Sequence, residues 1–249
     1  MIRLEHDHNL IEMFSSIQGE GPYVGYRQIF IRFVGCNLNC FFCDTLSQQN
    51  YANCQVEETP GLKDFIKIPN PLSSVDVLEL INKWHPEIHH SVSFTGGEPL
   101  LNLPSLKVLM PQVKLLNLKT LLETNGTLPG QLTEVLELID IISMDIKLPS
   151  LAGKDYYSEH LEFLKISNEK NIYVKIVVTD DILLDEFLSG VNLIYQINPN
   201  VPLIIQPSSS VNDCRMPVSE KILKFHEKAR QKLAIVRVIP QTHKMMAQL

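Results

Sequence analysis

Residues 28–43 read Gln-Ile-Phe-Ile-Arg-Phe-Val-Gly-Cys-Asn-Leu-Asn-Cys-Phe-Phe-Cys, an apolar strand that runs directly into three cysteines. Six more β-type runs follow, and stretches with helical spacing separate most of them. This repeated order of strand and helix predicts an α/β fold with a parallel sheet, either open and doubly wound or a partial barrel. The expected strands span 28–34, 91–94, 120–123, 141–145, 172–178, 203–206 and 235–239, and the expected helices 75–84, 105–116, 133–138, 155–168, 182–195 and 219–232.

Composition narrows the class of protein. The 249 residues, 45% of them hydrophobic, suit a single domain over residues 1–249. A net charge of −6 argues against a broad nucleic-acid surface and favours small ligands. No apolar run approaches the roughly 20 residues that span a bilayer, and no export signal is evident. Five cysteines, three of them within eight residues, are poor material for a disulfide framework, so we expect a cytoplasmic protein with a metal site.

Polar side chains follow five of the expected strands at their carboxyl ends. In parallel α/β folds ligands bind at that edge, so these residues should converge on one face. The segment 46–72 has weak periodicity and contains Cys54; we interpret it as an insertion over that face, either a lid or a disordered loop. The converging groups are Gly35-Cys36, Thr95-Gly96-Gly97-Glu98, Glu123-Thr124-Asn125-Gly126, Asp145 with Lys147, and Gln206-Pro207-Ser208-Ser209.

The spacing Cys36-x3-Cys40-x2-Cys43 places three thiolates in one short loop. Thiolates are the ligands of iron–sulfur clusters, and three of them leave one iron of a 4Fe-4S cluster open. The amino and carboxylate groups of S-adenosylmethionine could occupy that position. A zinc site with Cys54 as fourth ligand and a set of buried, inert cysteines are the alternatives, although structural zinc sites favour paired Cys-x2-Cys elements.

Two motifs together are similar to the radical S-adenosylmethionine superfamily: the cysteine loop and the turn Gly96-Gly97-Glu98-Pro99. Glycines in such a turn allow the backbone to approach a cofactor closely, and a backbone carbonyl or Glu98 can accept from its ammonium group. Phe41 and Phe42 either shield the cluster from water or belong to the core. Between an open doubly wound sheet and a partial barrel, we expect the latter: an incomplete TIM-like barrel of parallel strands with outer helices and the cysteine loop after the first strand.

More stretches resemble the 7-carboxy-7-deazaguanine synthase family: residues 14–21 (Phe-Ser-Ser-Ile-Gln-Gly-Glu-Gly), 29–33, Cys43-Asp44-Thr45 and Gln241-Thr242-His243-Lys244. The resemblance covers nearly the whole chain. It implies a lyase that converts 6-carboxy-5,6,7,8-tetrahydropterin into 7-carboxy-7-deazaguanine with loss of ammonia, on the route to queuosine. It also implies magnesium, an external electron donor such as flavodoxin or ferredoxin, and a homodimer, with no membrane and no direct nucleic-acid partner.

The resemblance also assigns roles to residues. Ile17, Gln18, Gly19, Arg32 and Thr95 match pterin contacts, and Glu20 stands beside them. Thr45 matches a magnesium ligand, an oxygen donor that this ion accepts. His243 and Lys244 frame the site, Leu249 could reach it, and Cys54 and Cys214 have no assigned role. The implied cofactor contacts are Phe42, Cys43, Asp44, Gly97, Glu98, Glu123, Asp145, Lys147, Gln206, Pro207, Ser208 and Ser209, beside the cluster ligands Cys36, Cys40 and Cys43.

Two rival functions remain open from sequence. An activase that installs a glycyl radical on a partner protein uses the same cysteine spacing, but the stretch Gln18-Gly19-Glu20-Gly21 and the C-terminal Gln-Thr-His-Lys favour the synthase. A non-catalytic iron–sulfur or zinc module would leave the Gly-Gly-Glu-Pro turn without a purpose. Without the resemblance, Arg32 would read as a salt-bridge residue at a strand end, and Glu123 as a structural glutamate beside a turn.

Overall fold

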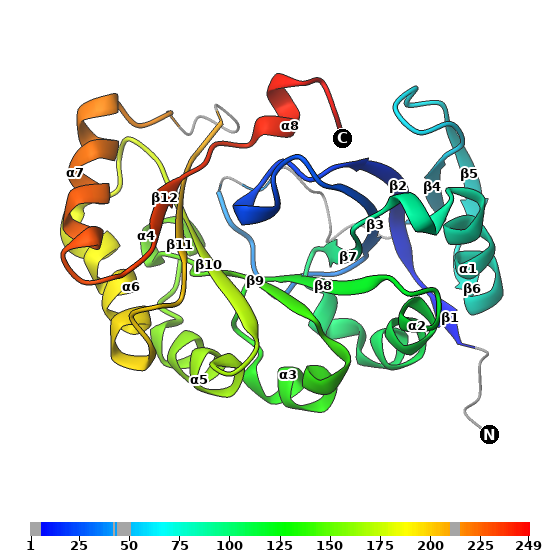
Figure 1. The fold of residues 1–249 in the computed structure, drawn as a ribbon, viewed down its shortest axis with the longest axis horizontal. Coiled ribbons are helices and arrows are strands. Elements are labelled where there is room, and N and C mark those ends of the chain that lie inside the picture. The colour runs from blue at the N-terminus through cyan, green and yellow to red at the C-terminus, as the bar shows by residue number, and fades with distance from the viewer. Residues whose placement is uncertain (1–5, 42, 44–50, 210–214) are drawn as a thin grey trace.

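The computed structural model describes residues 6–41, 43, 51–209 and 215–249. Its main sheet has ten strands in the order β12-β11-β10-β9-β8-β7-β3-β2-β4-β5, and a separate pair joins β1 to β6 (Figure 1). The strands are β1 Asp7–His8, β2 Leu10–Ile17, β3 Arg27–Phe33, β4 Asn53–Glu57, β5 Phe65–Pro69, β6 Leu72–Ser73, β7 Ser91–Gly96, β8 Lys119–Thr124, β9 Ile141–Asp145, β10 Asn171–Val178, β11 Leu203–Pro207 and β12 Val236–Val238.

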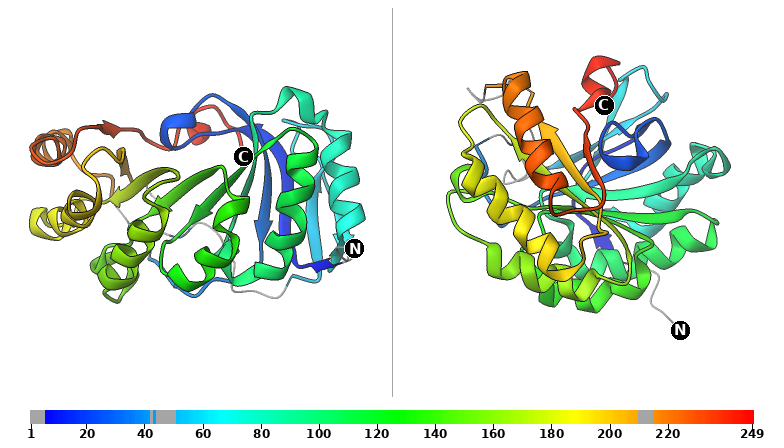
Figure 2. Two further views of the ribbon diagram at one scale, coloured as in Figure 1. Left: turned by 60° about the horizontal axis from the view of Figure 1, so that its bottom comes forward. Right: turned by 60° about the vertical axis from the view of Figure 1, so that its left-hand side comes forward.

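Seven neighbouring strands, from β12 to β3, run parallel, and they are the seven that the sequence predicts. The sheet curves with helices on its outer side, but its edge strands β12 and β5 do not pair, so the barrel is incomplete, as expected (Figures 1 and 2). The α-helices are α1 Ser74–Lys83, α2 Leu103–Leu115, α3 Pro129–Val135, α4 Pro149–Ala152, α5 Tyr157–Ser167, α6 Leu184–Ile197, α7 Ser219–Arg230 and α8 Thr242–Met245; the 3-10 turns are η1 Gly21–Tyr23, η2 Pro86–Ile88, η3 Pro99–Asn102 and η4 Leu136–Leu138.

The sequence prediction was wrong about two parts of this sheet. The strand before the cysteine loop is not the first, because β2 precedes it and pairs antiparallel with β3. Most residues of β2 are buried, so its sequence lacks the alternation that marks a half-exposed strand. The segment 46–72 is not simply a loop: within it, β4 and β5 form an antiparallel hairpin that extends the sheet beyond β2.

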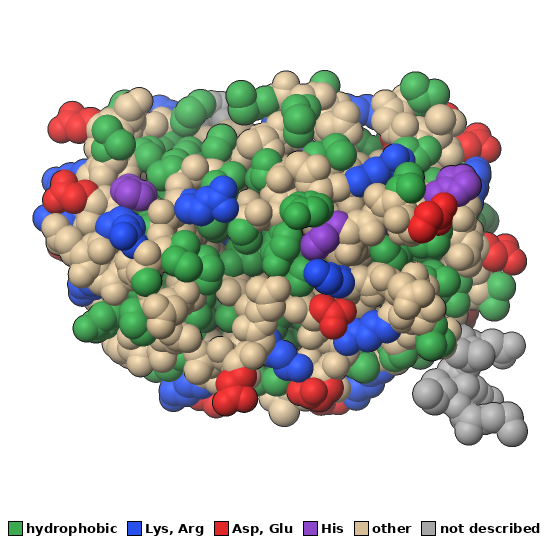
Figure 3. Space-filling view, viewed as in Figure 1, with side chains coloured by type: hydrophobic (Ala, Val, Ile, Leu, Met, Phe, Trp, Pro, Cys, Tyr) green, Lys and Arg blue, Asp and Glu red, His purple; other side chains and the backbone are tan. Residues whose placement is uncertain are grey.

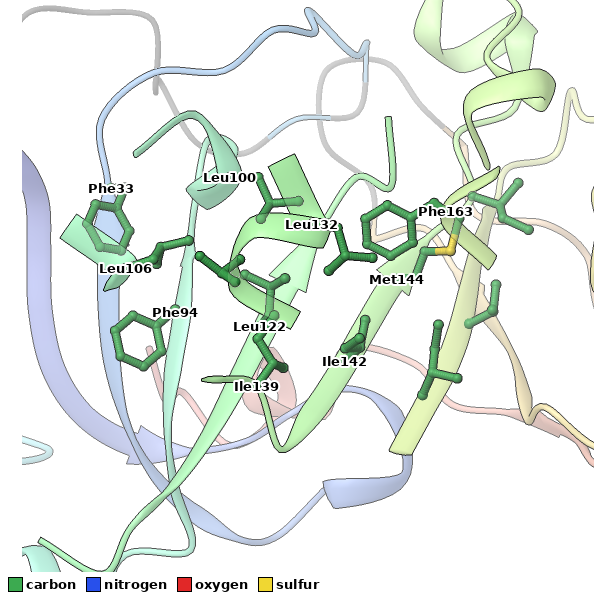
Figure 4. Packing of buried hydrophobic residues seen from close by; sticks show 14 of the residues in the cluster. Phe33, Phe94, Leu100, Leu106, Leu122, Leu132, Ile139, Ile142, Met144 and Phe163 are labelled. Atoms are coloured by element: carbon green, nitrogen blue, oxygen red, sulfur yellow. The ribbon is translucent and has the colours of Figure 1, made fainter. Parts of the chain in front are cut away.

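The core lies between the outer side of the sheet and the helices (Figure 4). Phe33, Phe94, Leu122 and Ile142 come from four successive neighbouring strands and are fully buried, and they pack in one cluster with residues of α2, α3 and α5. Because side chains alternate along a strand, the residues between them point to the inner side. That side is where the polar residues Arg32, Thr95, Glu123 and Ser143 lie.

The inner, concave side of the sheet is covered by two segments from opposite ends of the chain. The loop between β2 and β3 and the C-terminal stretch with α8 lie side by side there in all three ribbon views (Figures 1 and 2). Thr242 donates from its backbone N to Gly19 O at 2.9 Å. On the face shown in Figure 3, acidic and basic side chains are interspersed. In the described part of the chain, no helix has the length and apolar character to cross a membrane.

A buried histidine makes the stability of this fold depend on pH. His8 is fully buried, with its ring nitrogens 2.8 Å from Ser105 Oγ and 2.9 Å from Ser74 Oγ. Burial, helped by the nearby His6, lowers the pKa of His8 to about 4. The unfolded chain therefore binds a proton at His8 below about pH 6.5, while the folded chain does so only near pH 4. The free energy of unfolding consequently decreases as the pH is lowered from about 6.5 to 4.

We expect urea unfolding to show this dependence directly. Between pH 7 and pH 4.5 the wild type should lose on the order of 2 kcal/mol more unfolding free energy than a His8→Gln variant, which cannot bind the proton. His85→Asn is the matched control, because His85 is exposed and has φ of 57°, a conformation that asparagine tolerates. Equal pH dependence of wild type and His8→Gln would contradict the assignment.

Candidate active site

A pocket opens on the inner side of the sheet, and most of the predicted site residues line it. Its wall includes residues from β3, β7, β8, β9, β10 and β11, the loop after β2 and the C-terminal stretch. Of the predicted residues it contains Ile17, Gln18, Gly19, Glu20, Arg32, Cys36, Cys40, Cys43, Thr95, Gly97, Glu123, Asp145, Lys147, Gln206, Ser208 and Ser209. Phe42, Asp44 and Thr45 lie outside the described residues, as does Cys214.

The cysteine loop lies at the carboxyl end of β3 and brings all three thiols to the pocket. Leu38 N donates to Cys36 Sγ at 3.4 Å, and a turn joins Cys43 N to Cys40 O at 3.1 Å. Burial raises the pKa of Cys36 and raises that of Cys40 to about 11. Phe41 is 64% exposed, so it does not belong to the core, which was one of the two roles the sequence suggested for it.

The glycine-rich turn after β7 is tied to this loop. Glu98 N donates to Gly35 O at 2.8 Å, and Gly97 N to Phe33 O at 3.2 Å. Gly96 has φ of +133°, and a Cβ there would lie 2.4 Å from Phe33 O, so both conformation and space require glycine. The turn thus presents its backbone to the pocket at Gly96 and Gly97.

Glu98 itself supports the neighbouring loop rather than lining the pocket. Its fully buried carboxylate accepts from Leu100 N at 3.0 Å, Thr124 Oγ1 at 2.8 Å and Asn125 N at 2.8 Å. Burial raises the pKa of Glu98 to about 7 despite these hydrogen bonds. The sequence offered two acceptors for the ammonium group of the cofactor, the Glu98 side chain and a backbone carbonyl of the turn. Of these two, only the backbone, at Gly96 and Gly97, lines the pocket. Pro207 is likewise absent from the pocket wall.

The predicted pterin contacts form a connected polar group. Gln18 Nε2 donates to Glu123 Oε1 at 2.9 Å, and Thr95 Oγ1 donates to Glu123 Oε2 at 2.9 Å. Glu123, predicted to contact the cofactor, therefore lies with the residues predicted to contact the substrate. Arg32 Nε donates to Glu12 Oε1 at 2.7 Å, so both readings of Arg32, salt bridge and pocket residue, hold in this structure.

Sequence reasoning missed Lys175, which lies on the inner side of β10. Its ammonium group forms an ion pair with Glu20, and Gln241 Nε2 donates to the other oxygen of that carboxylate at 2.8 Å. Burial alone would raise the pKa of Glu20, but Lys175 and the hydrogen bonds lower it to about 2. Glu20 is therefore ionised at every physiological pH. The pKa of Lys175 is raised by its carboxylate neighbours against the opposing effect of burial.

A second ion pair lies beside the cysteine loop. Lys147 Nζ donates to Asp145 Oδ2 at 2.7 Å, and both side chains are nearly buried. Burial opposes the charge of Lys147, but Asp145 raises its pKa above the ordinary value. The other oxygen, Asp145 Oδ1, is buried without a hydrogen-bond partner, as is Gln206 Oε1. These two unsatisfied acceptors at the pocket are suited to donors on a bound ligand.

The chain is similar in sequence and in fold to known proteins. Residues 30–188 match the Radical SAM superfamily. The chain is 42% identical to a 7-carboxy-7-deazaguanine synthase from Geobacter sulfurreducens over 96% of this chain and 97% of that one, and 36% identical to the one from Archaeoglobus fulgidus over 96% and 97%. The chain belongs to the 7-carboxy-7-deazaguanine synthase family of the radical SAM superfamily. Its fold is similar to that of QueE from Escherichia coli, with a TM-score of 0.60, 22% identity and 95% coverage of both chains.

Membership of the radical SAM superfamily implies a 4Fe-4S cluster and S-adenosylmethionine, and the donor set fits them. All three cysteines line one pocket, and unsatisfied polar atoms of Asp145 and Gln206 belong to residues of the same wall. The zinc alternative required Cys54, but Cys54 is fully buried in the core on β4 and donates to Gln55 O. Among the described residues no three His, Cys, Asp or Glu side chains are arranged to bind a single metal ion.

Proposed function

We propose that this chain converts 6-carboxy-5,6,7,8-tetrahydropterin into 7-carboxy-7-deazaguanine with release of ammonia. The observation that carries the proposal is the meeting, in one pocket, of the three-cysteine loop, the Gly96-Gly97 turn and the polar group around Glu20, Arg32 and Glu123. The 42% identity to a synthase of that name supports it. When bound, the cluster supplies the electron that cleaves S-adenosylmethionine and starts radical chemistry.

The cofactors would be held at the carboxyl ends of the strands. Cys36, Cys40 and Cys43 bind the cluster, and Gly97 offers its backbone to the cofactor. Asp145 Oδ1 and Gln206 Oε1 are unsatisfied acceptors for the amino and hydroxyl donors of S-adenosylmethionine. Further cofactor contacts are proposed for Phe42, Asp44, Glu123, Lys147, Pro207, Ser208 and Ser209, with Glu98 supporting the turn beneath.

The substrate would lie against the loop after β2. A pterin presents N–H donors on one edge and, here, a carboxylate on the other. The ionised Glu20 and the Gln18–Glu123 pair provide acceptors for the N–H donors of the pterin. The Arg32 guanidinium can bind the pterin carboxylate through bidentate hydrogen bonds. Ile17, Gly19 and Thr95 complete this contact surface. The loop and the C-terminal stretch together cover the pocket and limit the access of water.

The remaining parts of the proposal rest on the family resemblance. Thr45 would supply one oxygen ligand to a magnesium ion, since this ion accepts single protein oxygens together with substrate oxygens such as those of a carboxylate. A flavodoxin or ferredoxin would supply the electron. We further propose that residues 1–249 act as one domain, that the enzyme is a homodimer, and that it works in the cytoplasm, where cluster thiolates stay reduced.

Product analysis tests the proposal. The chain is reconstituted anaerobically with iron and sulfide and incubated with reductant, magnesium, S-adenosylmethionine and 6-carboxytetrahydropterin, and products are identified by mass spectrometry. We expect 7-carboxy-7-deazaguanine. Deoxyadenosine without that product would refute the substrate and reopen the activase alternative. Absence of both from a chain with a complete cluster would refute the enzymatic function.

A further inference from the structure

The C-terminal stretch contacts the proposed substrate loop along several residues. Thr242 donates to Gly19 O from both its backbone N, at 2.9 Å, and its Oγ1, at 3.1 Å. His243 packs so closely that a Cβ on Gly19 would lie 2.2 Å from its Nδ1. Ser16 Oγ donates to Gln248 Oε1 at 3.2 Å. The stretch is therefore bound to one side of the pocket through residues 16–20.

Gln241 also connects this stretch to the other side of the pocket. Its Nε2 donates to Glu20 Oε1 at 2.8 Å, and its Oε1 accepts from Ser209 Oγ in the loop after β11. Ser209 Oγ also accepts from Lys244 Nζ at 2.8 Å. An amide has a donor end and an acceptor end, so one side chain can bond both loops at the same time. Gln241 is the bridge between the proposed substrate contact Glu20 and the proposed cofactor contact Ser209.

We propose that Gln241 is a positioning residue that couples the two binding sites, so that S-adenosylmethionine and the pterin bind cooperatively. The inference rests on the proposed function, which assigns Glu20 to the substrate and Ser209 to the cofactor. A ligand that holds one loop in place also holds Gln241, and Gln241 holds the other loop through its second hydrogen bond before the second ligand binds. Coupling of this kind is reciprocal, so each ligand raises the affinity for the other by the same factor.

Binding without turnover measures this factor. With the cluster kept in its oxidised state and no reductant present, anaerobic calorimetry gives the Kd of S-adenosylmethionine with and without saturating 6-carboxytetrahydropterin. We expect the pterin to tighten binding about tenfold in the wild type, within the usual range for coupled sites. In Gln241→Met, which keeps the length of the side chain but loses both hydrogen bonds, the factor should fall to about one.

Two further variants separate coupling from structure. Gln248→Met makes the same change in the same stretch, where the amide accepts a hydrogen bond from Ser16 and does not join the two loops, and should keep the wild-type factor. Ser209→Ala breaks the bridge from the cofactor side and should lose the factor, and adding Gln241→Met should lower it no further.

The outcomes are distinct. A Gln241→Met enzyme that binds both ligands more weakly but keeps the tenfold ratio would overturn the proposal, because a purely structural role predicts that result. A wild type without coupling would overturn it as well. If the wild type makes no deazaguanine product, the proposed function fails instead.

Discussion

A Cys40→Ala variant is expected to contain no stable 4Fe-4S cluster and to form no detectable product. Cys40 is the middle of three thiols in an eight-residue loop, and all three line the pocket. With one thiolate removed, two protein ligands remain for a cluster that needs three, and no other cysteine in the described residues lies at the pocket. Iron and sulfide content, the visible absorption of the cluster and deoxyadenosine formation would each report the loss.

Cys54→Ala is the matched control for this experiment. Cys54 lies fully buried on β4, away from the pocket wall, and makes one weak hydrogen bond to Gln55 O at 3.8 Å. Its replacement should leave iron content and product formation unchanged and cost roughly 1 kcal/mol of stability through lost packing. Full activity in Cys40→Ala, or loss of the cluster in Cys54→Ala, would show that the loop does not bind the cluster as proposed.

The parallel part of the sheet could be predicted from sequence because its strands carry local signals. Short β-type runs alternate with helical spacing, and the polar residues follow the strands at one edge. The extension by β2, β4 and β5 gave no such signal: β2 is buried on both faces, and β4 and β5 are short strands of five residues each. Their pairing depends on tertiary contacts with β3 and with each other, which single-sequence periodicity does not report.

The candidate site likewise contains some residues that a local motif identifies and others that only tertiary contacts bring together. The cysteine loop and the Gly96-Gly97 turn are contiguous motifs, and sequence alone placed them correctly at strand ends. Lys175 is a single lysine within an apolar strand, and its partner Glu20 lies 155 residues away. The bridge from Gln241 to Glu20 spans 221 residues. Sequence singled out Glu20 and the stretch that contains Gln241, but not their contacts with each other or with Lys175, because these contacts exist only in the folded chain.

Lys175→Met is expected to be among the most damaging single substitutions in the pocket outside the cysteines. It removes the ammonium group from the ion pair with Glu20 and leaves a carboxylate in a largely buried site, where Gln241 and the nearby His243 compensate only in part. Breaking one partner of such a pair typically costs about 3 kcal/mol or more. The pKa of Glu20, which Lys175 holds low, should rise, and pterin turnover should become dependent on pH in the neutral range.

The double variant Glu20→Gln/Lys175→Met separates charge from binding. An amide at position 20 needs no cation, so unfolding free energy should recover by most of the amount lost in Lys175→Met, and the pH dependence should disappear. Pterin affinity should stay weak, because the proposed acceptor for its N–H edge has lost its charge. Urea unfolding and the KM for the pterin read these two effects separately. A double variant with wild-type KM would show that Glu20 serves the fold alone, and an unrecovered stability would show that Lys175 does more than neutralise Glu20.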